Sequence, residues 1–176
     1  MNIKQYLDST YLKTAEQAGI SEEKNNLVAQ EFIQEAIEEH FKLIMIRPEM
    51  VSLAKKMITE ANSLVQIGTV IDFPEGTSSL EDKLQEALHA IQDGADDLDF
   101  VSNYQAFKNG EIDLVKEEIL RCTQLGLAHN KVVKWIIEVA ALTEKEIIQL
   151  SSLIKNVIVS NFEQELFPVH LRPRPS

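Results

Sequence analysis

The sequence predicts an α/β fold in which about six parallel strands alternate with amphipathic helices. Two observations lead to this prediction. Short apolar runs recur about every thirty residues and are separated by segments with helical periodicity, a pattern that requires right-handed βαβ crossovers. Two of these runs also carry charged residues on one face and bulky apolar residues on the other, as do the strands of a barrel whose outer face packs on helices.

Each predicted strand is a run of apolar or β-branched residues that ends at a turn signal. The third run, for example, closes at the turn formed by Pro74, Glu75 and Gly76. We find no internal repeat, low-complexity segment or interdomain linker between the runs. The predicted strands are residues 6–10, 41–46, 65–73, 96–101, 132–139 and 156–160.

The helices are predicted from their caps and from apolar residues at helical spacing. Hydroxyl side chains precede several apolar stripes, proline opens one helix, and glycines follow the ends of two others. Two of the helices are expected to end at Gly94 and Gly126, and Glu146 is expected to complete a capping box with Thr143. The expected helix starts are after Ser21, at Pro48, after Ser79, near Ile112 and after Thr143.

The run at residues 96–101, DDLDFV, places acidic residues inside a predicted strand. Because side chains alternate along a strand, Asp97 and Asp99 share one face while Leu98 and Phe100 share the other. Burying a carboxylate without a partner costs several kcal/mol, so such a residue is usually paired or used. The alternative is that both aspartates lie at a solvated strand end.

The run at residues 132–139 repeats this arrangement, with Lys134 and Glu138 at even spacing on one face. A lysine beside carboxylates in a partly desolvated interior suits imine chemistry and proton transfer. A structural ion pair that fills the barrel explains Lys134 equally well.

Composition limits the function classes. The chain of 176 residues is long enough for one domain with a proper core. Its net charge of −11 argues against nucleic acid or an anionic membrane as a partner, although a local nest or helix N-terminus can still bind a small phosphorylated substrate. The single cysteine, Cys122, gives neither a disulfide framework nor a thiolate metal site. The N-terminus has no apolar leader, and the chain has no run of membrane-spanning length, which predicts a cytoplasmic protein.

The last residues break the pattern. Three of the five prolines lie in residues 167–176, and proline at this density forms neither a central strand nor a helix. We therefore divide the chain into a partial barrel domain, 1–162, and a proline-rich tail, 163–176. The break indicates a chain that was cut or read out of frame; an ordinary frayed terminus is the alternative.

Four motifs together resemble deoxyribose-phosphate aldolase, a class I aldolase family with a (β/α)8 TIM barrel. The resemblance runs from residue 2 to about residue 161, with the motifs in the family's order and spacing, and implies an incomplete barrel of about six strands. The motifs are YLDSTYLK at 6–13, GTVIDFPEG at 68–76, DGADDLDFV at 93–101 and VKWIIE at 133–138.

The resemblance implies a mechanism. In the family, a lysine forms a Schiff base with the aldehyde, and an aspartate, a second lysine and water transfer protons. The reaction cleaves 2-deoxy-D-ribose 5-phosphate to glyceraldehyde 3-phosphate and acetaldehyde without a metal or organic cofactor. The proton-transferring aspartate corresponds to Asp99, and an active-site aspartate of the first strand corresponds to Asp8. With Lys134, added from the charge pattern, these are the predicted catalytic residues.

Two departures from the family pattern matter. Where the family often has Cys-Val-Asn-Pro, this chain reads Met45-Ile46-Arg47-Pro48, and Met45 is expected to line a pocket or fill the core because a thioether is neither thiol nor base. The family's Schiff-base motif, Phe-Val-Lys-x-Ser-Thr-Gly, corresponds to LFPVHLR at 166–172, and no lysine follows Lys155. Lys134 could replace that lysine only with a depressed pKa, whereas neighbouring carboxylates raise it.

Two further readings compete with an active aldolase. One is a catalytically inactive, truncated barrel that lacks the Schiff-base lysine and at most binds a ligand or another subunit; its exposed strand edges would favour a homo-oligomer. The other is a flavodoxin-like binding domain, which fits the alternation but not the motifs, because the first loop contains no phosphate-binding glycine.

Overall fold

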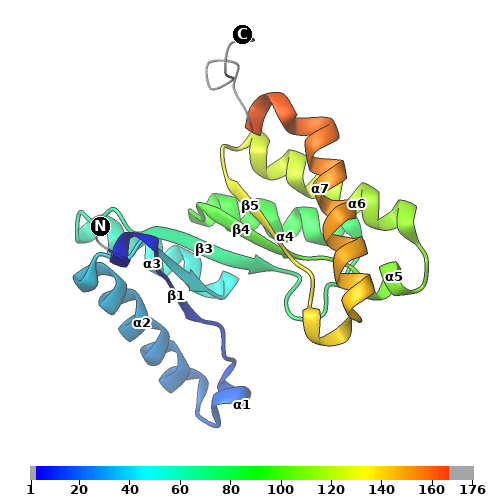
Figure 1. Ribbon diagram of the computed structural model, residues 1–176. Coiled ribbons are helices and arrows are strands. Elements are labelled where there is room, and N and C mark those ends of the chain that lie inside the picture. Colours follow the sequence, from blue (N-terminus) through cyan, green and yellow to red (C-terminus); the bar gives the residue numbers. More distant parts are fainter. Residues whose placement is uncertain (1–2, 167–176) are drawn as a thin grey trace.

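The computed structural model describes residues 3–166, in which five strands form one parallel sheet (Figure 1). The strands pair in chain order, and at least one helix follows each of them before the chain continues. This arrangement is the one expected from the alternation of strands and helices. The strands are β1 (Asp8–Tyr11), β2 (Leu43–Ile46), β3 (Gln66–Ile71), β4 (Asp97–Val101) and β5 (Val132–Ile136).

The predicted N-caps are confirmed at three helices. The side chains of Ser21 and Ser79 each accept a hydrogen bond from a backbone N–H in the first turn, and Thr143 forms a capping box with Glu146. The helices are α1 (Ala15–Ala18), α2 (Glu22–Glu39), α3 (Val51–Glu60), α4 (Leu80–Asp93), α5 (Tyr104–Lys108), α6 (Ile112–Ala128) and α7 (Glu144–Leu166), with 3-10 turns η1 (Ile3–Tyr6), η2 (Pro48–Met50) and η3 (Val139–Ala141).

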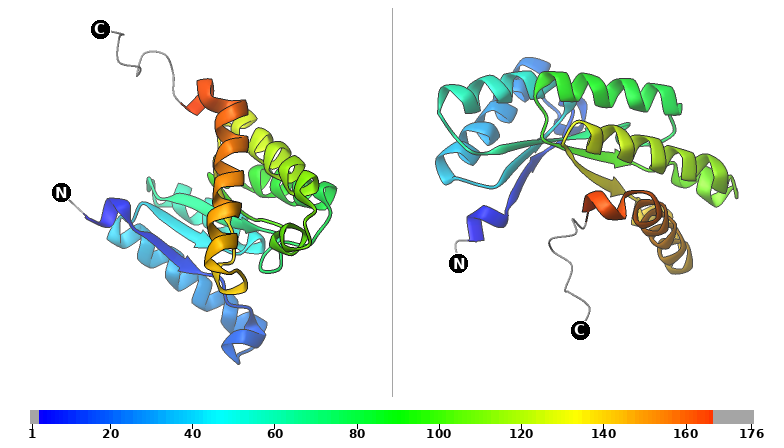
Figure 2. Two further views of the ribbon diagram at one scale, coloured as in Figure 1. Left: turned by 45° about the vertical axis from the view of Figure 1, so that its right-hand side comes forward. Right: turned by 90° about the horizontal axis from the view of Figure 1, so that it is seen from above.

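The main helices lie along the convex side of the curved sheet, and its concave side is open (Figure 2). The main core fills the space between the sheet and helices α2, α3 and α4. Ile44, Ile67, Leu98 and Phe100 point into it from three neighbouring strands. Phe100 also stacks on Trp135, with ring centroids 5.3 Å apart. The prediction that Leu98 and Phe100 share the helix-covered face is confirmed.

The concave face carries the other half of each strand. The register pairs Met45 with Gly68, Gly68 with Asp97, and Asp99 with Lys134, so these residues lie side by side across the sheet. Gly68 leaves room for the methionine, because a Cβ there would lie 2.5 Å from Met45 Cε. The expectation that Met45 fills the interior is confirmed, since its side chain is buried in a small cluster with Leu43 and Val70.

The predicted sixth strand is wrong. Residues 156–160 belong to α7, which continues without a break to Leu166. Leu150, Ile154, Val157 and Ile158 pack into one cluster, and their spacing of three and four residues is that of a helix face. This helical packing outweighs the β-branched composition of the segment.

Two predicted boundaries also differ. Gly126 lies inside α6 rather than ending it, and it is needed there because a Cβ would lie 2.2 Å from Val133 Cγ2. Strand β5 ends at Ile136, so Glu138 lies outside it, in a left-handed conformation with φ 51°. The even spacing that grouped Glu138 with Lys134 therefore does not apply.

The boundary predicted between a barrel domain and a tail at residue 162 lies within α7, and most of the predicted tail lies outside the described residues. Within residues 3–166, no helix is both long enough and apolar enough to cross a membrane.

Candidate active site

Four charged side chains meet on the concave face of the sheet. The Lys134 Nζ atom lies 3.2 Å from Asp99 Oδ1, 3.4 Å from Asp97 Oδ2 and 3.8 Å from Asp8 Oδ2. The three residues predicted as catalytic, Asp8, Asp99 and Lys134, thus come together. Asp97 completes the group, which we call the Lys134 cluster.

The cluster follows from the register and the curvature of the sheet. Asp97 and Asp99 share one face of β4, and Asp99 pairs directly with Lys134 on β5. Asp8 lies on β1, at the opposite end of the strand order. Four strand spacings of about 4.8 Å would separate β1 from β5 by about 19 Å in a flat sheet. The 3.8 Å contact of Lys134 with Asp8 therefore requires the sheet to curl so that its two edges face each other.

Burial and charge act in opposite directions on the cluster. Burial raises the pKa of Asp97 and of Asp99, and the attraction of Lys134 offsets only part of that rise. Partial burial pulls the pKa of Lys134 down, but attraction to Asp99 and Asp97 together outweighs it, and the pKa is raised. The site thus combines a lysine held as a cation with carboxyl groups that retain protons more readily than ordinary aspartates do.

Exposure differs across the cluster. The side chains of Lys134 and Asp8 are 38% and 45% exposed, whereas those of Asp99 and Asp97 are 17% and 8% exposed. Asp97 Oδ1 is buried and accepts no hydrogen bond from the residues that the structure describes. Asp99 Oδ1 faces Lys134 at 3.2 Å without the alignment of a hydrogen bond. The buried carboxylate oxygens of Asp97 and Asp99 can therefore accept further hydrogen bonds.

Part of the remaining concave face is apolar. Leu43, Met45 and Val70 form its floor, with Phe73 and Ile136 packed against them. An apolar floor beside charged groups lowers the local dielectric constant and strengthens their interactions.

Arg47, in the segment that reads Met45-Ile46-Arg47-Pro48, already has polar partners. Its Nε atom lies 3.2 Å from Glu49 Oε1, and its Nη1 atom donates to the Leu12 carbonyl oxygen at 3.3 Å. The guanidinium thereby ties the segment after β2 to the segment after β1.

The sequence reasoning missed a second lysine-centred group. Lys83 is fully buried, and its ammonium contacts the carboxylates of Glu118 and Asp72, the latter at 3.3 Å. It also donates to the carbonyl oxygens of Gly76 at 3.0 Å and Val101 at 2.8 Å. We call this set the Lys83 network.

The Lys83 network holds the two loops that follow β3 and β4. Glu118 accepts a hydrogen bond from the backbone N–H of Asn103, and Asp72 accepts from the backbone and hydroxyl of Ser78. A signal for these residues was present in the sequence. Lys83 shares a helix face with Ala87, since four residues separate them, and Glu118 similarly neighbours buried Cys122.

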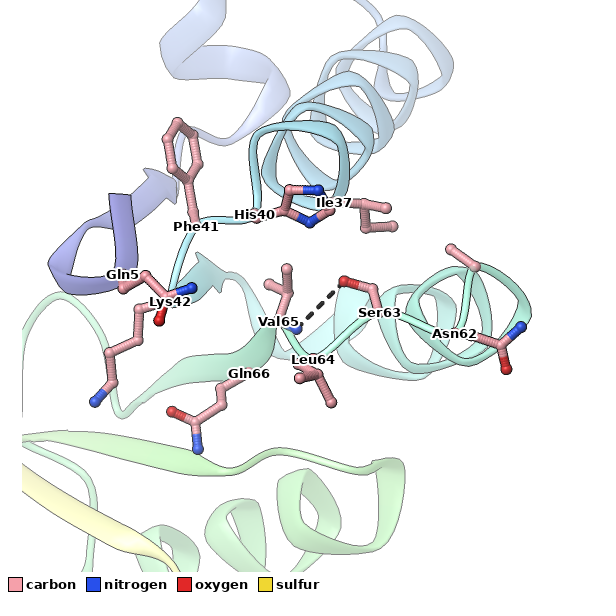
Figure 3. Close-up of a pocket in the computed structure, with 11 residues that line it drawn as sticks. Gln5, Ile37, His40, Phe41, Lys42, Asn62, Ser63, Leu64, Val65 and Gln66 are labelled. Carbon is pink, nitrogen blue, oxygen red and sulfur yellow. Dashed lines mark hydrogen bonds between the residues drawn. The ribbon is translucent and has the colours of Figure 1, made fainter. Parts of the chain in front are cut away.

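A hollow of about 590 Å³ lies elsewhere, where the chain enters β2 and β3 (Figure 3). No carboxylate is among its described lining residues, and its polar side chains are those of Gln5, His40, Lys42, Asn62, Ser63 and Gln66. It opens at the amino-terminal ends of the strands, whereas barrel enzymes react at the carboxyl-terminal face. Its size alone does not make it the active site.

Among residues 3–166, no group of three or more histidine, cysteine, aspartate or glutamate side chains is arranged to hold a metal ion.

Comparison with known proteins identifies relatives. The family model described as DeoC/LacD family aldolase matches residues 12–153. The deoxyribose-phosphate aldolase of Thermococcus gammatolerans is 36% identical over 155 residues, which make up 88% of this chain and 65% of that protein. The enzyme of the same name from Lactiplantibacillus plantarum is 35% identical, over 88% of this chain and 67% of that protein. The chain thus spans about two thirds of the length of these relatives.

Solved structures give the same fold. A putative deoxyribose-phosphate aldolase from Coccidioides immitis superposes with a TM-score of 0.73 at 30% identity, covering 88% of this chain and 56% of that one. An aldolase designated QR15 superposes with a TM-score of 0.75 at 29% identity, covering 89% and 65%. The five-stranded sheet is therefore an incomplete TIM barrel, as predicted, with one strand fewer than expected.

Proposed function

The chain belongs to the DeoC/LacD family of aldolases, and we propose that its Lys134 cluster serves the reversible cleavage of 2-deoxy-D-ribose 5-phosphate to glyceraldehyde 3-phosphate and acetaldehyde. The single observation that carries this proposal is the meeting of Lys134 with three aspartates on the concave face. The substrate is proposed from the names of the Thermococcus and Lactiplantibacillus relatives, both deoxyribose-phosphate aldolases.

Asp99 is the proposed proton-transfer group. In Schiff-base cleavage, a lysine amine first condenses with the C1 aldehyde and releases water, and residues 156–176 of this chain contain no lysine for that step. A base then removes the proton of the C3 hydroxyl and the C2–C3 bond breaks, which leaves an aldehyde at C3. The electron pair of that bond forms a C1–C2 double bond while the C1–N π pair moves to nitrogen. C2 must then receive a proton before the imine is hydrolysed. Burial raises the pKa of Asp99 above its ordinary value, so its carboxyl group takes up a proton more readily than an exposed aspartate and can return it. Asp99 is partly exposed, so substrate and water can reach it.

Lys134 is proposed as a fixed cation. Its raised pKa keeps the amine protonated at neutral pH, and a protonated amine cannot attack a carbonyl. Its positive charge, beside Asp99, stabilises the carboxylate that forms when Asp99 releases its proton. Asp8 holds the ammonium from the opposite edge of the sheet.

A second candidate is a barrel without turnover. It is favoured by the sequence after Lys155, where residues 156–176 contain no further lysine to match the family's Schiff-base motif. In that case the cluster would keep the geometry of the family and lack the covalent step, which positioned charges alone do not replace.

The test is a turnover assay that measures glyceraldehyde 3-phosphate released from 2-deoxyribose 5-phosphate. In an otherwise complete barrel, which supplies the imine-forming lysine, we expect product, and we expect Asp99→Asn to lose about a hundredfold or more of the turnover, the usual scale for a positioned acid–base group. Asp113→Asn, on an exposed side chain in the first turn of α6, is the matched control and should leave turnover unchanged.

The Lactiplantibacillus relative serves as the positive control. No product from this chain under conditions in which that enzyme is active would favour the second candidate. Full turnover in Asp99→Asn would remove Asp99 from the proposed mechanism.

Association with a second copy is a further part of the proposal. In residues 3–166, β1 and β5 end the strand order, so each has one edge that pairs with no described strand. Such edges favour strand pairing between chains. Sedimentation velocity would show a dimer or larger species if the edges are used, and a monomer at all concentrations if they are not.

A further inference from the structure

We propose that Asp97 is a positioning residue that holds the Lys134 ammonium against the Asp99 carboxylate. The role rests on the proposed function, in which Asp99 and Lys134 act as a pair. Neither the family mechanism nor the charge pattern assigned a task to Asp97, and the geometry does so independently of both.

Burial is the first argument. The Asp97 side chain is 8% exposed, the least exposed of the four in the Lys134 cluster. It lies at the start of β4, where the register places it beside Gly68 on β3 and Val132 on β5. Neither neighbour has a polar side chain, so the polar partner of Asp97 must come from elsewhere on the concave face.

Lys134 is that partner. Its Nζ atom lies 3.4 Å from Asp97 Oδ2, and among the described residues no hydrogen-bond partner reaches Asp97 Oδ1. A buried carboxylate with one cationic contact and one unpartnered oxygen costs free energy that packing alone does not recover. Its retention is explained if it directs Lys134.

The distances from the three aspartates to the Lys134 ammonium indicate how Asp97 holds it. Asp97 and Asp99 are two residues apart on one strand and contact the same ammonium, at 3.4 Å and 3.2 Å. Asp8 reaches it more weakly, at 3.8 Å from a half-exposed side chain. Without Asp97, the half-exposed lysine would keep a single close partner and could swing toward Asp8 and solvent.

The other charged groups near Asp97 do not replace it. Asp96, which precedes β4, accepts a hydrogen bond from the backbone N–H of Ile67 at 3.0 Å. Asp8 and Asp99 carry the same sign as Asp97 and are themselves contacts of Lys134. Among the described residues, Lys134 is therefore the one cation in contact with Asp97.

The test measures the reactivity of the Lys134 amine by trace acetylation at pH 8, read by peptide mass spectrometry. The exposed Lys56 gives the reference rate, and buried Lys83 reports whether the fold has opened. Loss of a close opposite charge shifts a pKa by about one unit or more, so Asp97→Asn should raise acetylation of Lys134 relative to Lys56 about tenfold. Lys83 should stay protected.

Two further variants sharpen the result. Asp93→Asn makes the same chemical change at an exposed position at the end of α4 and should leave the Lys134 rate unchanged. Asp97→Glu keeps the charge and should restore most of the protection. An unchanged Lys134 rate in Asp97→Asn would overturn the proposal, and so would equal gains at Lys134 and Lys83, which indicate general loosening.

If Asp97→Asn does not fold, Lys134→Met decides the question. The carboxyl ¹³C signals of Asp97 and Asp99 should then both titrate at higher pH than in the unmodified chain, because both lose the same cation. A shift at Asp99 alone would overturn the proposal. None of these measurements needs substrate, so they stand even if the turnover assay refutes the proposed function.

Discussion

Two lysines of this chain sit among carboxylates, and their surroundings are opposite in kind. Lys83 is fully buried, contacts Glu118 and Asp72, and donates to two backbone carbonyl oxygens. Lys134 is 38% exposed, and its ion-pair partners among the described residues are three carboxylates, two of which have a buried oxygen without a hydrogen bond. The first lysine has its donors matched by acceptors, whereas the second lies among acceptors that are only partly used.

This difference separates a structural from a chemical role. A buried ion pair with satisfied hydrogen bonds holds its elements in one arrangement, and the Lys83 network does so for the loops after β3 and β4. Carboxyl groups with raised pKa values beside an accessible lysine cation suit a site where the carboxyl groups exchange protons with a substrate. The presence of a lysine among acids does not by itself indicate an active site; exposure and unused acceptors make the Lys134 cluster the candidate.

The largest expected effect is on the free energy of unfolding, which should fall more when Lys83 is replaced than when Lys134 is. Lys83→Met should lower the free energy of unfolding by about 3–5 kcal/mol, because Glu118 and Asp72 would remain buried without their cation. Lys134→Met should cost less, about 1–3 kcal/mol, because Lys134 and Asp8 are partly exposed and burial already favours the protonated forms of Asp97 and Asp99. Urea denaturation followed by circular dichroism measures both. Equal losses in the two variants would contradict the distinction.

The single cysteine reports on the same region with a somewhat smaller effect. Cys122 is buried near Glu118, and burial raises its pKa to about 12, so its thiol should react with a disulfide reagent only when the protein opens. Lys83→Met should accelerate this reaction about a hundredfold or more if opening is global. Lys134→Met should change it little. Rapid labelling of the unmodified chain would show that the Lys83 region is not the stable part of the fold.

The smallest expected effect is on the pH dependence of stability. Burial raises the pKa of Asp97, Asp99, Glu86 and Glu118 in the folded chain. The folded state therefore binds more protons than the unfolded state from about pH 4 up to these raised values, and stability should fall as pH rises through that window.

The slope of stability against pH shows which carboxyl groups titrate differently in the folded and unfolded chains. Asp97→Asn removes one of them and should flatten the fall in the urea midpoint with pH, whereas Asp93→Asn should leave the slope as it is. Identical slopes in the unmodified chain and Asp97→Asn would mean that Asp97 titrates alike in both states.

The sequence predicted the sheet because each strand combines a local pattern with a turn signal. Alternation placed Asp97 and Asp99 opposite Leu98 and Phe100, and the structure has this arrangement. The run at residues 156–160 failed because composition alone suggested a strand, while the apolar spacing from Leu150 onward continues a helix. Strand existence was predictable where flanking signals agreed with composition.

The Lys134 cluster and the Lys83 network also differed in how far the sequence predicted them. Lys134 and Asp99 could be paired from sequence because strand alternation puts them on one face, but the contact with Asp8 depends on the curl of the whole sheet. Lys83 was missed because a lysine on an amphipathic helix is usually solvated. Its place on the buried stripe with Ala87 and Ala90 was the available signal.

The most direct test of the distinction is borohydride trapping with 2-deoxyribose 5-phosphate, read by intact mass and peptide mapping, with the Lactiplantibacillus enzyme as the labelled control. Because its neighbours keep Lys134 protonated, we predict that the peptide containing Lys134 stays unmodified, and that any adduct maps to another lysine. A stable adduct on Lys134 would contradict the account, since it would make this residue the nucleophile rather than the fixed cation beside Asp99.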